Sequence, residues 1–281
     1  MRVELTCLYL PFELRRACFP EAHLITFSRS LSRSKNVLPG FNGTGSSQKV
    51  QNAILLSLPP DEFDTLLPKL FFGELPKHAL LNEIAQPIEW GYFINSGLAS
   101  FLNVMADGKS VEVGLSGKEG FVGLPLLGGF STSPSRALMQ VDGSAFRISA
   151  VDMQDALKTC SSLDRSLQRC SQLLGMQAMQ IAACNRLHEV DQRLARWLLM
   201  SQDRLVGDVL SLTQETLASM LGTRRASVTE AAGILQKAGL ITYRRGDVKI
   251  DDRRGLEAAA CECYGTMRRL TDKWRSEAAS A

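Results

Sequence analysis

Basic side chains concentrate in one short segment near the C-terminal end of this 281-residue chain. Between Gly222 and Ile250 the basic residues are Arg224, Arg225, Lys237, Arg244, Arg245 and Lys249. Only Glu230 and Asp247 oppose them, so the local net charge is +4, which predicts contact with phosphate groups. Arg225 suits a bidentate bond to guanine, and Glu230 suits accepting from a cytosine amino group. Alternatively, Glu230 pairs with Arg224 or Arg225 on the protein surface.

Two helices joined by a tight turn are expected to position these side chains. Thr213 is a good N-cap for the first helix, and Gly222 can end it in the left-handed conformation. The second helix is expected from about Thr223 to Lys237. Its apolar stripe is Val228, Ala231, Ala232 and Leu235, and its opposite side carries Ala226, Thr229, Glu230, Gly233 and Lys237. This pattern is typical of a helix-turn-helix that presents its second helix to the major groove of DNA.

A short hairpin is expected directly after the second helix, which Gly239 ends. Its strands would be Leu240 to Tyr243 and Asp247 to Ile250, and its turn carries Arg244-Arg245-Gly246. Such a wing places arginines on the DNA backbone, whereas a helical hairpin with solvated charges explains neither the clustered charge nor the glycines. The predicted DNA-binding residues are Thr213, Gln214, Arg224, Arg225, Ser227, Thr229, Glu230, Tyr243, Arg244 and Arg245.

The cysteines and histidines offer no recognisable ligand motif. They are Cys7, Cys18, Cys160, Cys170, Cys184, Cys261, Cys263, His23, His78 and His188. No Cys-x-x-Cys pair occurs, and the histidines form no ligand-spaced cluster with the cysteines. An odd number of scattered cysteines also argues against a disulfide framework. We therefore expect buried thiols and neither a metal nor a cofactor. No metal-ligand cluster, phosphate-binding glycine loop or Ser/His/Asp arrangement indicates an enzyme.

A long helical stretch from about Val151 to Leu199 precedes the helix-turn-helix. Leu167, Leu174, Ile181 and His188 recur every seven residues, with Leu163, Cys170, Gln177 and Cys184 on the alternate seam. A period of 3.5 predicts a helix packed along a partner helix, here in a homodimer. The alternative is a helix packed on its own domain.

Short β-rich runs separated by turn signals occupy Phe72 to Ile148. The expected strands include Trp90 to Ile94, Ala99 to Val104, Ser110 to Leu115 and Ala137 to Val141. Asp107-Gly108 predicts a hairpin, and Asn95-Ser96-Gly97 and Asp142-Gly143 predict further turns. This spacing predicts an antiparallel sandwich or barrel. Short helices are expected before it, from about Asn52 to Leu70.

Residues 1–49 show little periodicity and are expected to form a poorly ordered basic tail. The opening residues lack the apolar core and cleavage site of a signal peptide, and no apolar run is long enough to span a bilayer. We therefore expect a cytoplasmic protein.

Two stretches carry a resemblance to a known family. Leu212-Thr213-Gln214-Glu215-Thr216-Leu217-Ala218, continuing through Leu221 to Thr229, and Val190 to Leu199 strongly resemble the Crp/Fnr regulators. The resemblance covers roughly Asn52 to Met267. It implies an α+β protein with an N-terminal β jelly roll (a double-stranded β-helix, cupin-like), a long dimerisation helix and a C-terminal winged helix-turn-helix. The expected domains are residues 1–49, the tail; 50–151, a cyclic-nucleotide-binding-like sensor; 152–199, dimerisation helix and hinge; and 200–281, DNA binding.

Departures from the family limit what is carried over. Arg225 matches its base-reading arginine, but Ala226 stands where many members have a glutamate, and Glu230 where cyclic-AMP-responsive members have an arginine. This predicts a different half-site.

In the expected sensor, the nucleotide-binding pattern of the family is replaced by Gly123-Leu124-Pro125 and Ser135-Arg136-Ala137. The carboxylate of that pattern is missing from this sequence. Cyclic AMP binding in the usual mode is therefore not expected, and Cys7 and Cys18 do not supply the iron–sulfur ligands of Fnr. Gly123, Ser135 and Arg136 remain candidate effector-binding residues.

The sequence therefore predicts a dimeric, sequence-specific transcription regulator. Its expected partners are double-stranded DNA, a second copy of itself and RNA polymerase. No interaction with a membrane is expected. An effector in the sensor would control it allosterically. The alternatives are a cyclic-nucleotide-binding signalling module and a constitutive DNA binder with a vestigial sensor.

Overall fold

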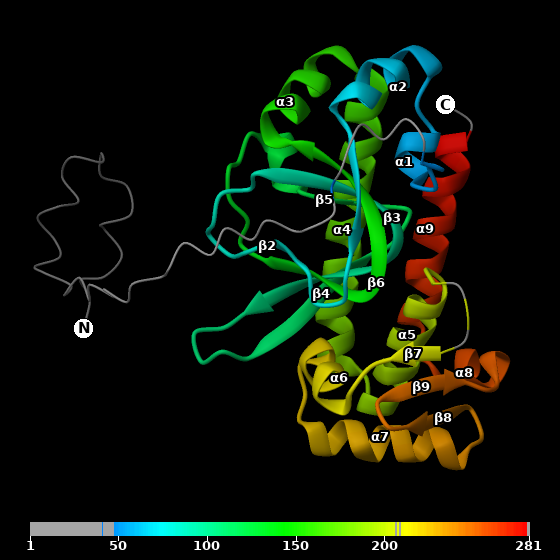
Figure 1. The fold of residues 1–281 in the computed structure, drawn as a ribbon. Helices are drawn as coiled ribbons and strands as arrows, with labels where there is room; N and C mark the ends of the chain where they lie inside the picture. The colour runs from blue at the N-terminus through cyan, green and yellow to red at the C-terminus, as the bar shows by residue number, and fades with distance from the viewer. Residues whose placement is uncertain (1–40, 42–47, 206, 208, 280–281) are drawn as a thin grey trace, which may run out of the picture. The chain divides into compact units, whose positions relative to one another are not determined.

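The computed structural model describes residues 41, 48–205, 207 and 209–279, and these residues belong to one compact unit (Figure 1). Of the predicted tail, all but residues 41, 48 and 49 lies outside the described residues. Phe41 is buried, and the Arg147 guanidinium carbon lies 4.1 Å from its ring centroid. This residue therefore packs with the sheet that follows.

Two short helices and a 3-10 turn open the continuous part of the chain, as predicted: α1 (Ala53–Leu56), α2 (Pro60–Leu66) and η4 (Leu67–Lys69). Asn52 caps α1 by accepting from the backbone N–H groups of Ile54 and Leu55. The Asn52 amide also donates to the carbonyls of Ile94 and Gly120, at 2.8 and 2.9 Å. One buried side chain thus fixes the helix to β3 and to the loop that precedes β5.

An antiparallel, jelly-roll-like sheet follows, as the sequence predicts. Its strands are β1 (Phe71–Leu75), β2 (Leu80–Asn82), β3 (Trp90–Val104), β4 (Ser110–Ser116), β5 (Phe121–Val122) and β6 (Arg136–Ser149). The order is β1-β6-β3-β4, while β2 pairs with β6 and β5 with β3. The hairpin predicted at Asp107-Gly108 joins β3 to β4, and Gly108 takes a φ of 84°.

Two of the predicted turns are wrong. Asn95-Ser96-Gly97 lies inside the continuous strand β3, and Asp142-Gly143 lies inside β6. The pairing of these strands shifts register between Ile94 and Ala99, so the turn formers bend a long strand instead of ending it. A Cβ at Gly143 would lie 2.0 Å from the Ser96 carbonyl oxygen, so only glycine permits this approach.

The predicted long helix is divided into α3 (Ala150–Thr159), α4 (Ser161–Leu187) and α5 (Val190–Gln202). The chain leaves α4 at His188, and Glu189 begins α5 with a capping box that includes Gln192. The region predicted to be helical is helical, but it is interrupted near Cys160 and at His188–Glu189. Helix α5 packs against α7 (Arg225–Lys237) and α8 (Arg253–Ala259) of the C-terminal domain, and the break at His188 separates it from the long helix α4.

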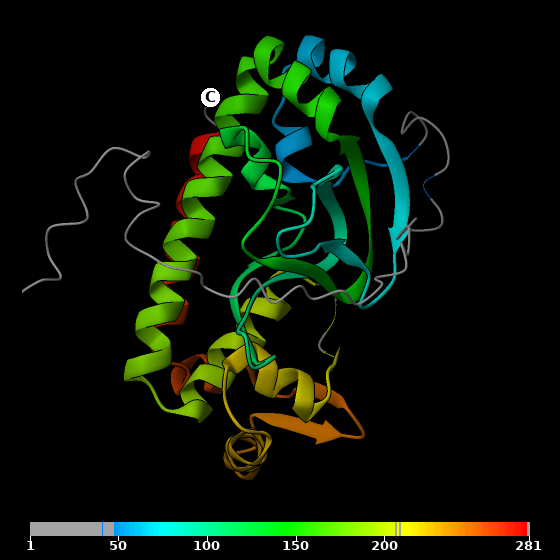
Figure 2. The same cartoon turned by 90° about the vertical axis from the view of Figure 1, so that its left-hand side faces the viewer.

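The seven-residue repeat of α4 faces the chain's own interior. Leu163, Leu167, Ile181 and Cys184 are at most 3% exposed, because α4 packs against β4 and the C-terminal helix α9 (Cys263–Ala279). Figure 2 shows α4 along one side of the sheet with α9 behind it. The alternative interpretation, a helix packed on its own domain, therefore describes this face. The other face of α4 is exposed, with Met179 66% and Leu187 74% accessible.

The C-terminal domain contains β7 (Val209–Ser211), α6 (Gln214–Leu221), α7 (Arg225–Lys237), β8 (Ile241–Arg244), β9 (Asp247–Ile250) and α8 (Arg253–Ala259). Strands β7, β9 and β8 form a three-stranded antiparallel sheet. Within the described ranges, no helix has the length and apolarity that crossing a bilayer requires.

Candidate nucleic-acid interface and sensor cavity

Helices α6 and α7 form the predicted helix-turn-helix. Thr213 caps α6 by accepting from the Thr216 N–H, and Gly222 ends it with a φ of 58°. The predicted apolar stripe of α7 is buried: Val228, Ala231, Ala232 and Leu235 are at most 3% exposed. The second helix is therefore held by its apolar side and presents its polar side outward.

The polar side of α7 is open to solvent. Arg224, Arg225, Thr229 and Glu230 are all exposed, and Ser227 is partly exposed. None of the ion pairs found within the described residues includes Glu230, Arg224 or Arg225. The alternative in which Glu230 pairs with a neighbouring arginine is therefore not the arrangement found. These side chains are accessible to an external binding partner.

The wing is a two-residue hairpin between β8 and β9. Arg244 pairs with Asp247 in register, which leaves Arg245 and Gly246 as the turn. Both take positive φ angles, 52° and 90°, a conformation that matches the twist of a hairpin. The Arg244 and Arg245 side chains are exposed.

A groove of about 720 Å³ collects most of the predicted contact residues. It is lined by Thr213, Gln214, Arg225, Thr229, Tyr243 and Arg245, among others. The Thr229 hydroxyl donates to the Gln214 side chain at 2.9 Å, and the Tyr243 hydroxyl donates to the Leu212 carbonyl at 2.7 Å. Arg224 and Ser227 instead line a second hollow beside the β3–β4 hairpin, whereas Glu230 and Arg244 line neither.

Two residues of the groove were missed at the sequence level. Glu215, in the first turn of α6, is exposed and lines the groove together with Arg225. Gln236 accepts from the Tyr243 N–H at 2.6 Å and so ties the wing to α7. The position of Glu215, one residue after the start of α6, could have identified it from the sequence as a residue of the groove. The Gln236 contact could not be predicted in this way, because it depends on how the β8–β9 hairpin packs against α7.

The candidate effector residues separate in the structure. Gly123 and Ser135 line a cavity of about 770 Å³ between the sheet, η5 (Leu124–Gly128) and α4. Arg136 does not line it, because its guanidinium forms an ion pair with Glu83 at 2.9 Å. The lining is mostly apolar, with Leu124, Leu127 and Phe130 prominent, and it includes no charged side chain.

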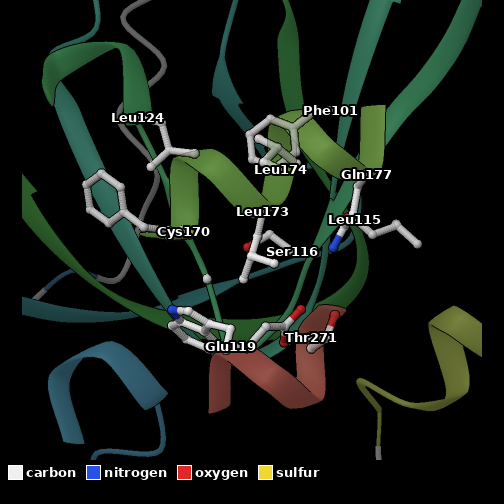
Figure 3. Close-up of a pocket in the computed structure, with 13 residues that line it drawn as sticks. Phe101, Leu115, Ser116, Glu119, Leu124, Cys170, Leu173, Leu174, Gln177 and Thr271 are labelled. Atoms are coloured by element: carbon white, nitrogen blue, oxygen red, sulfur yellow. The ribbon is translucent and has the colours of Figure 1, made fainter. Parts of the chain in front are cut away.

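A second, smaller cavity of about 30 Å³ lies where β4, α4 and α9 meet (Figure 3). Ser116, Glu119 and Gln177 line it together with Trp274 of α9. Its volume is that of about one or two water-sized probes, far below the 300 Å³ or more of typical ligand pockets. A cavity of this size does not qualify as an effector site. It is a small gap where α9 packs against the sheet and α4.

Buried polar contacts link the sheet to the C-terminal domain. Glu112 of β4 accepts from Ser100 at 2.6 Å and from the Trp197 indole of α5 at 2.8 Å. Burial raises the pKa of Glu112 to about 7. Burial also acts to raise the pKa of Glu119. The positive charge of Arg204, whose Nε lies 2.6 Å from the Glu119 carboxylate, outweighs burial, so the pKa of Glu119 is lowered.

The turn of the helix-turn-helix also touches the sheet. A Cβ at Gly222 would lie 2.8 Å from Val111 of β4, and the Gln140 amide of β6 contacts the Met220 sulfur at 3.2 Å. Strands β4 and β6 of the sheet are therefore in direct contact with α6 and with the turn that joins it to α7.

Comparisons with known proteins agree with this geometry. The profile of the Crp-like helix-turn-helix domain matches residues 192–259. No curated protein sequence matches the chain.

Solved structures share the fold. The structure of FixK2 from Bradyrhizobium japonicum has a TM-score of 0.59 at 16% identity, covering 68% of this chain and 98% of that one. A regulator of the crp/fnr family from Eubacterium rectale has a TM-score of 0.60 at 17% identity, covering 73% and 96%. The c-di-GMP-responsive regulator CLP of Xanthomonas campestris has a TM-score of 0.57 at 18% identity, covering 69% and 100%. The helix α9 lies beyond the matched profile.

Proposed function

We propose that this chain is a DNA-binding transcription regulator of the Crp/Fnr type and that two copies bind one near-palindromic DNA site through α7 and the wing. The observation that carries the proposal is the exposed polar face of α7, where arginines without an acidic partner among the described residues border a groove closed by the wing. For a two-fold dimer the half-sites would lie about 34 Å apart, one turn of DNA.

The position of each side chain suggests its role. Arg225 borders both hollows at the N-terminal end of α7, so it is placed to reach a base edge. Glu230 and Thr229 lie one turn further along the same exposed side and would contact bases or phosphates. Arg244 and Arg245 would bind the backbone, together with Thr213 and Gln214 at the start of α6.

The exposed face of α4 is the surface we assign to the second copy. Its Gly175, Met179 and Ala182 are exposed, whereas the seven-residue repeat is used within the chain. In such a dimer α4 would pack along its symmetry mate, and α5 would carry the two α7 helices to successive major grooves.

Control would pass from the 770 Å³ cavity through β4 and α5 to the helix-turn-helix. The cavity is of the size that drug-sized ligands occupy, and α4 contributes Ser171 and Leu174 to it. Because its lining offers no cationic side chain, an uncharged and largely apolar effector fits better than a cyclic nucleotide. A cyclic phosphate would have to displace Glu83 from Arg136. RNA polymerase would be the partner through which promoter binding alters transcription.

Selection of bound sites from random duplex DNA, with and without cell extract, tests the proposal. We expect a near-palindromic site, and a change with extract would indicate an effector. Arg225→Ala should cost about 1–3 kcal/mol on the best site and relax preference at one position. Arg244→Ala should weaken all sequences alike and lower the salt slope by about 1. An unchanged sequence preference in Arg225→Ala would remove this residue from the base-reading set.

A further inference from the structure

Four side chains from distant parts of the sequence meet at the break between α4 and α5. They are Cys184 and His188 at the end of α4, Cys261 between α8 and α9, and Cys263 at the start of α9. Their ligand atoms all lie within 4.8 Å of one another. The expectation that the histidines form no cluster with the cysteines is therefore wrong, because the fold returns α9 to the end of α4 across more than seventy residues.

The distances fit one tetrahedral ion. With zinc–sulfur bonds of about 2.3 Å and zinc–nitrogen bonds of about 2.0 Å, ideal tetrahedral ligands lie about 3.8 Å (sulfur to sulfur) and 3.5 Å (sulfur to nitrogen) apart. The Sγ atoms of Cys184 and Cys261 are 3.5 Å apart, and the Sγ of Cys263 is 3.6 Å from the Nδ1 of His188. A disulfide needs about 2.05 Å, so these thiols are not bonded to each other. A four-iron cluster would hold its ligands farther apart, because each would bind a different iron atom.

The surroundings of the cluster are those of a metal site. The Glu262 carboxylate lies 3.0 Å from the Nε2 of His188, which leaves Nδ1 facing the thiols. Ligating histidines usually hold a carboxylate in this way, and it fixes the tautomer that can bind a metal. The Gln180 amide donates to the Cys263 sulfur at 3.0 Å, as a hydrogen bond to a bound thiolate would require. All three cysteines are at most 4% exposed.

Buried positive charge beside the cluster is an independent observation. Arg193 and Arg196 of α5 are 6% and 2% exposed, and their buried Nε atoms have no hydrogen-bond partner among the described residues. Both arginines lie close enough to the Cys184 thiol to interact with it electrostatically. Buried cations need nearby anions. Three thiolates around a divalent ion carry a net charge of −1, which would offset part of this charge.

We propose that Cys184, His188, Cys261 and Cys263 bind one Zn²⁺ ion in a closed tetrahedral site. Four protein ligands leave no open position, so the site is structural and not catalytic. It fastens the start of α9 to the end of α4, at the break where α5 begins.

The site also reaches the helix-turn-helix. The guanidinium of Arg193, beside the thiols, donates to the carbonyl of Leu221, the residue directly before the Gly222 turn. Metal occupancy would therefore stabilise the arrangement of α5 and α6 that presents α7 to DNA. This coupling rests on the proposed function, whereas metal binding itself can be measured without DNA.

Metal titration of the full chain tests the site. The reduced, chelator-treated protein should bind one Co²⁺ per chain, with the visible bands of tetrahedral cobalt and a thiolate-to-cobalt charge-transfer band. One equivalent of Zn²⁺ should abolish both and raise the thermal unfolding midpoint. An octahedral cobalt spectrum, an iron–sulfur chromophore in the purified protein or an unchanged unfolding midpoint would overturn the proposal.

Matched variants locate the ligands. Cys263→Ser should abolish the charge-transfer band at one equivalent, and Glu262→Gln should weaken metal binding by about 10–100-fold while the tetrahedral spectrum persists. Cys160→Ser, which removes a buried thiol outside the cluster, should bind like the wild type. Equal binding by Cys263→Ser and wild type would overturn the assignment. Should Cys263→Ser fail to fold, the Glu262→Gln comparison decides, because equal affinity there contradicts it too.

The coupling is read separately, on the DNA site selected above. Chelator-treated protein should bind this site more weakly, and Zn²⁺ should restore the affinity in wild type but not in Cys263→Ser. Equal affinity with and without metal would overturn the coupling and leave the metal site standing. Loss of specific DNA binding in both states would instead overturn the proposed function.

Discussion

Glu112 is the buried acid that connects the sheet to α5. Its carboxyl is 2% exposed and sits between the Ser100 hydroxyl and the Trp197 indole. Burial disfavours the charged form, and the two hydrogen bonds and the Arg196 charge offset this only in part. A titration near neutral pH is thereby placed at the contact between the sheet and the DNA-binding domain.

Stability should therefore depend on the protonation of Glu112. The pKa rises from 4.5 to about 7 on folding, so the folded state binds more protons than the unfolded state between these values. The free energy of unfolding should fall as pH rises through this window, by up to about 3 kcal/mol. In Glu112→Gln, whose amide resembles the protonated acid, this slope should be lost.

Urea denaturation between pH 4.5 and 8 measures the effect. Glu74→Gln, at an exposed glutamate of β1, serves as the control and should keep the wild-type slope. Parallel pH profiles for Glu112→Gln and wild type would show that this carboxyl does not control the slope.

Arg245 takes a backbone conformation that suits another residue. Its φ of 52° in a two-residue turn before Gly246 favours asparagine, and a side chain such as arginine costs about 1 kcal/mol there. Arg245→Asn should raise the free energy of unfolding by up to about 1 kcal/mol. It should also weaken binding to all DNA sequences and lower the salt slope by about 1, because a phosphate contact is lost. Filter binding across salt concentrations measures this, and an unchanged slope would exclude Arg245 from the interface.

At the scale of elements, the α6–α7 turn depends on one glycine. Gly222→Ala would strain the left-handed backbone and push a Cβ to 2.8 Å from Val111. The cost should be about 1–3 kcal/mol in the free energy of unfolding. Gly233→Ala, within α7 and with no atom within 4 Å of the added Cβ, should instead stabilise by about 0.5–1 kcal/mol.

Denaturant unfolding of both variants separates the two causes when Val111→Ala is added to Gly222→Ala. That second change removes the clash and leaves the backbone strain, so part of the stability should return. Full recovery would assign the whole cost to the β4 contact, and no recovery would assign it to the backbone.

Local signals predicted the elements of the DNA-binding domain well. The Thr213 cap, the Gly222 terminator and the hairpin turn at Arg244-Arg245-Gly246 depend on neighbours within a few residues, so the sequence contains them. The strands β3 and β6 were harder, because Gly97 and Gly143 are turn formers by type. Only the close approach of the two strands makes them bends.

At the scale of the molecule, prediction failed where distant segments meet. Cys184 and His188 are four residues apart on a helix, and Cys261 and Cys263 form a second close pair, but each pair alone is a common pattern. The fold of α9 against α4 is what makes them a cluster. The same packing buries the seven-residue repeat of α4. The sequence predicted the period of this repeat but not what it packs against. The burial of Leu167 and Ile181 shows that it packs within the same chain, where α4 contacts α9 and β4.

The free face of α4 leads to a prediction about assembly. Met179 is 66% exposed between the exposed residues Gly175 and Ala182, and in the proposed dimer it would be buried against its symmetry mate. Met179→Glu would place two like charges in that apolar contact, so the dimer should dissociate at micromolar concentration. Sedimentation equilibrium measures the change. Affinity for the near-palindromic site should fall with it, because each monomer would bind one half-site alone.

Val151→Glu is the matched control, since Val151 is 73% exposed and belongs to α3, not to α4. It adds the same charge at an apolar surface position and should leave both the dimer and its DNA affinity intact. A Met179→Glu protein that remains dimeric and binds DNA like the wild type would place the dimer contact elsewhere. The path by which the sheet domain controls α7 would then have to run through β4 and α5 alone, without the pairing of the long helices.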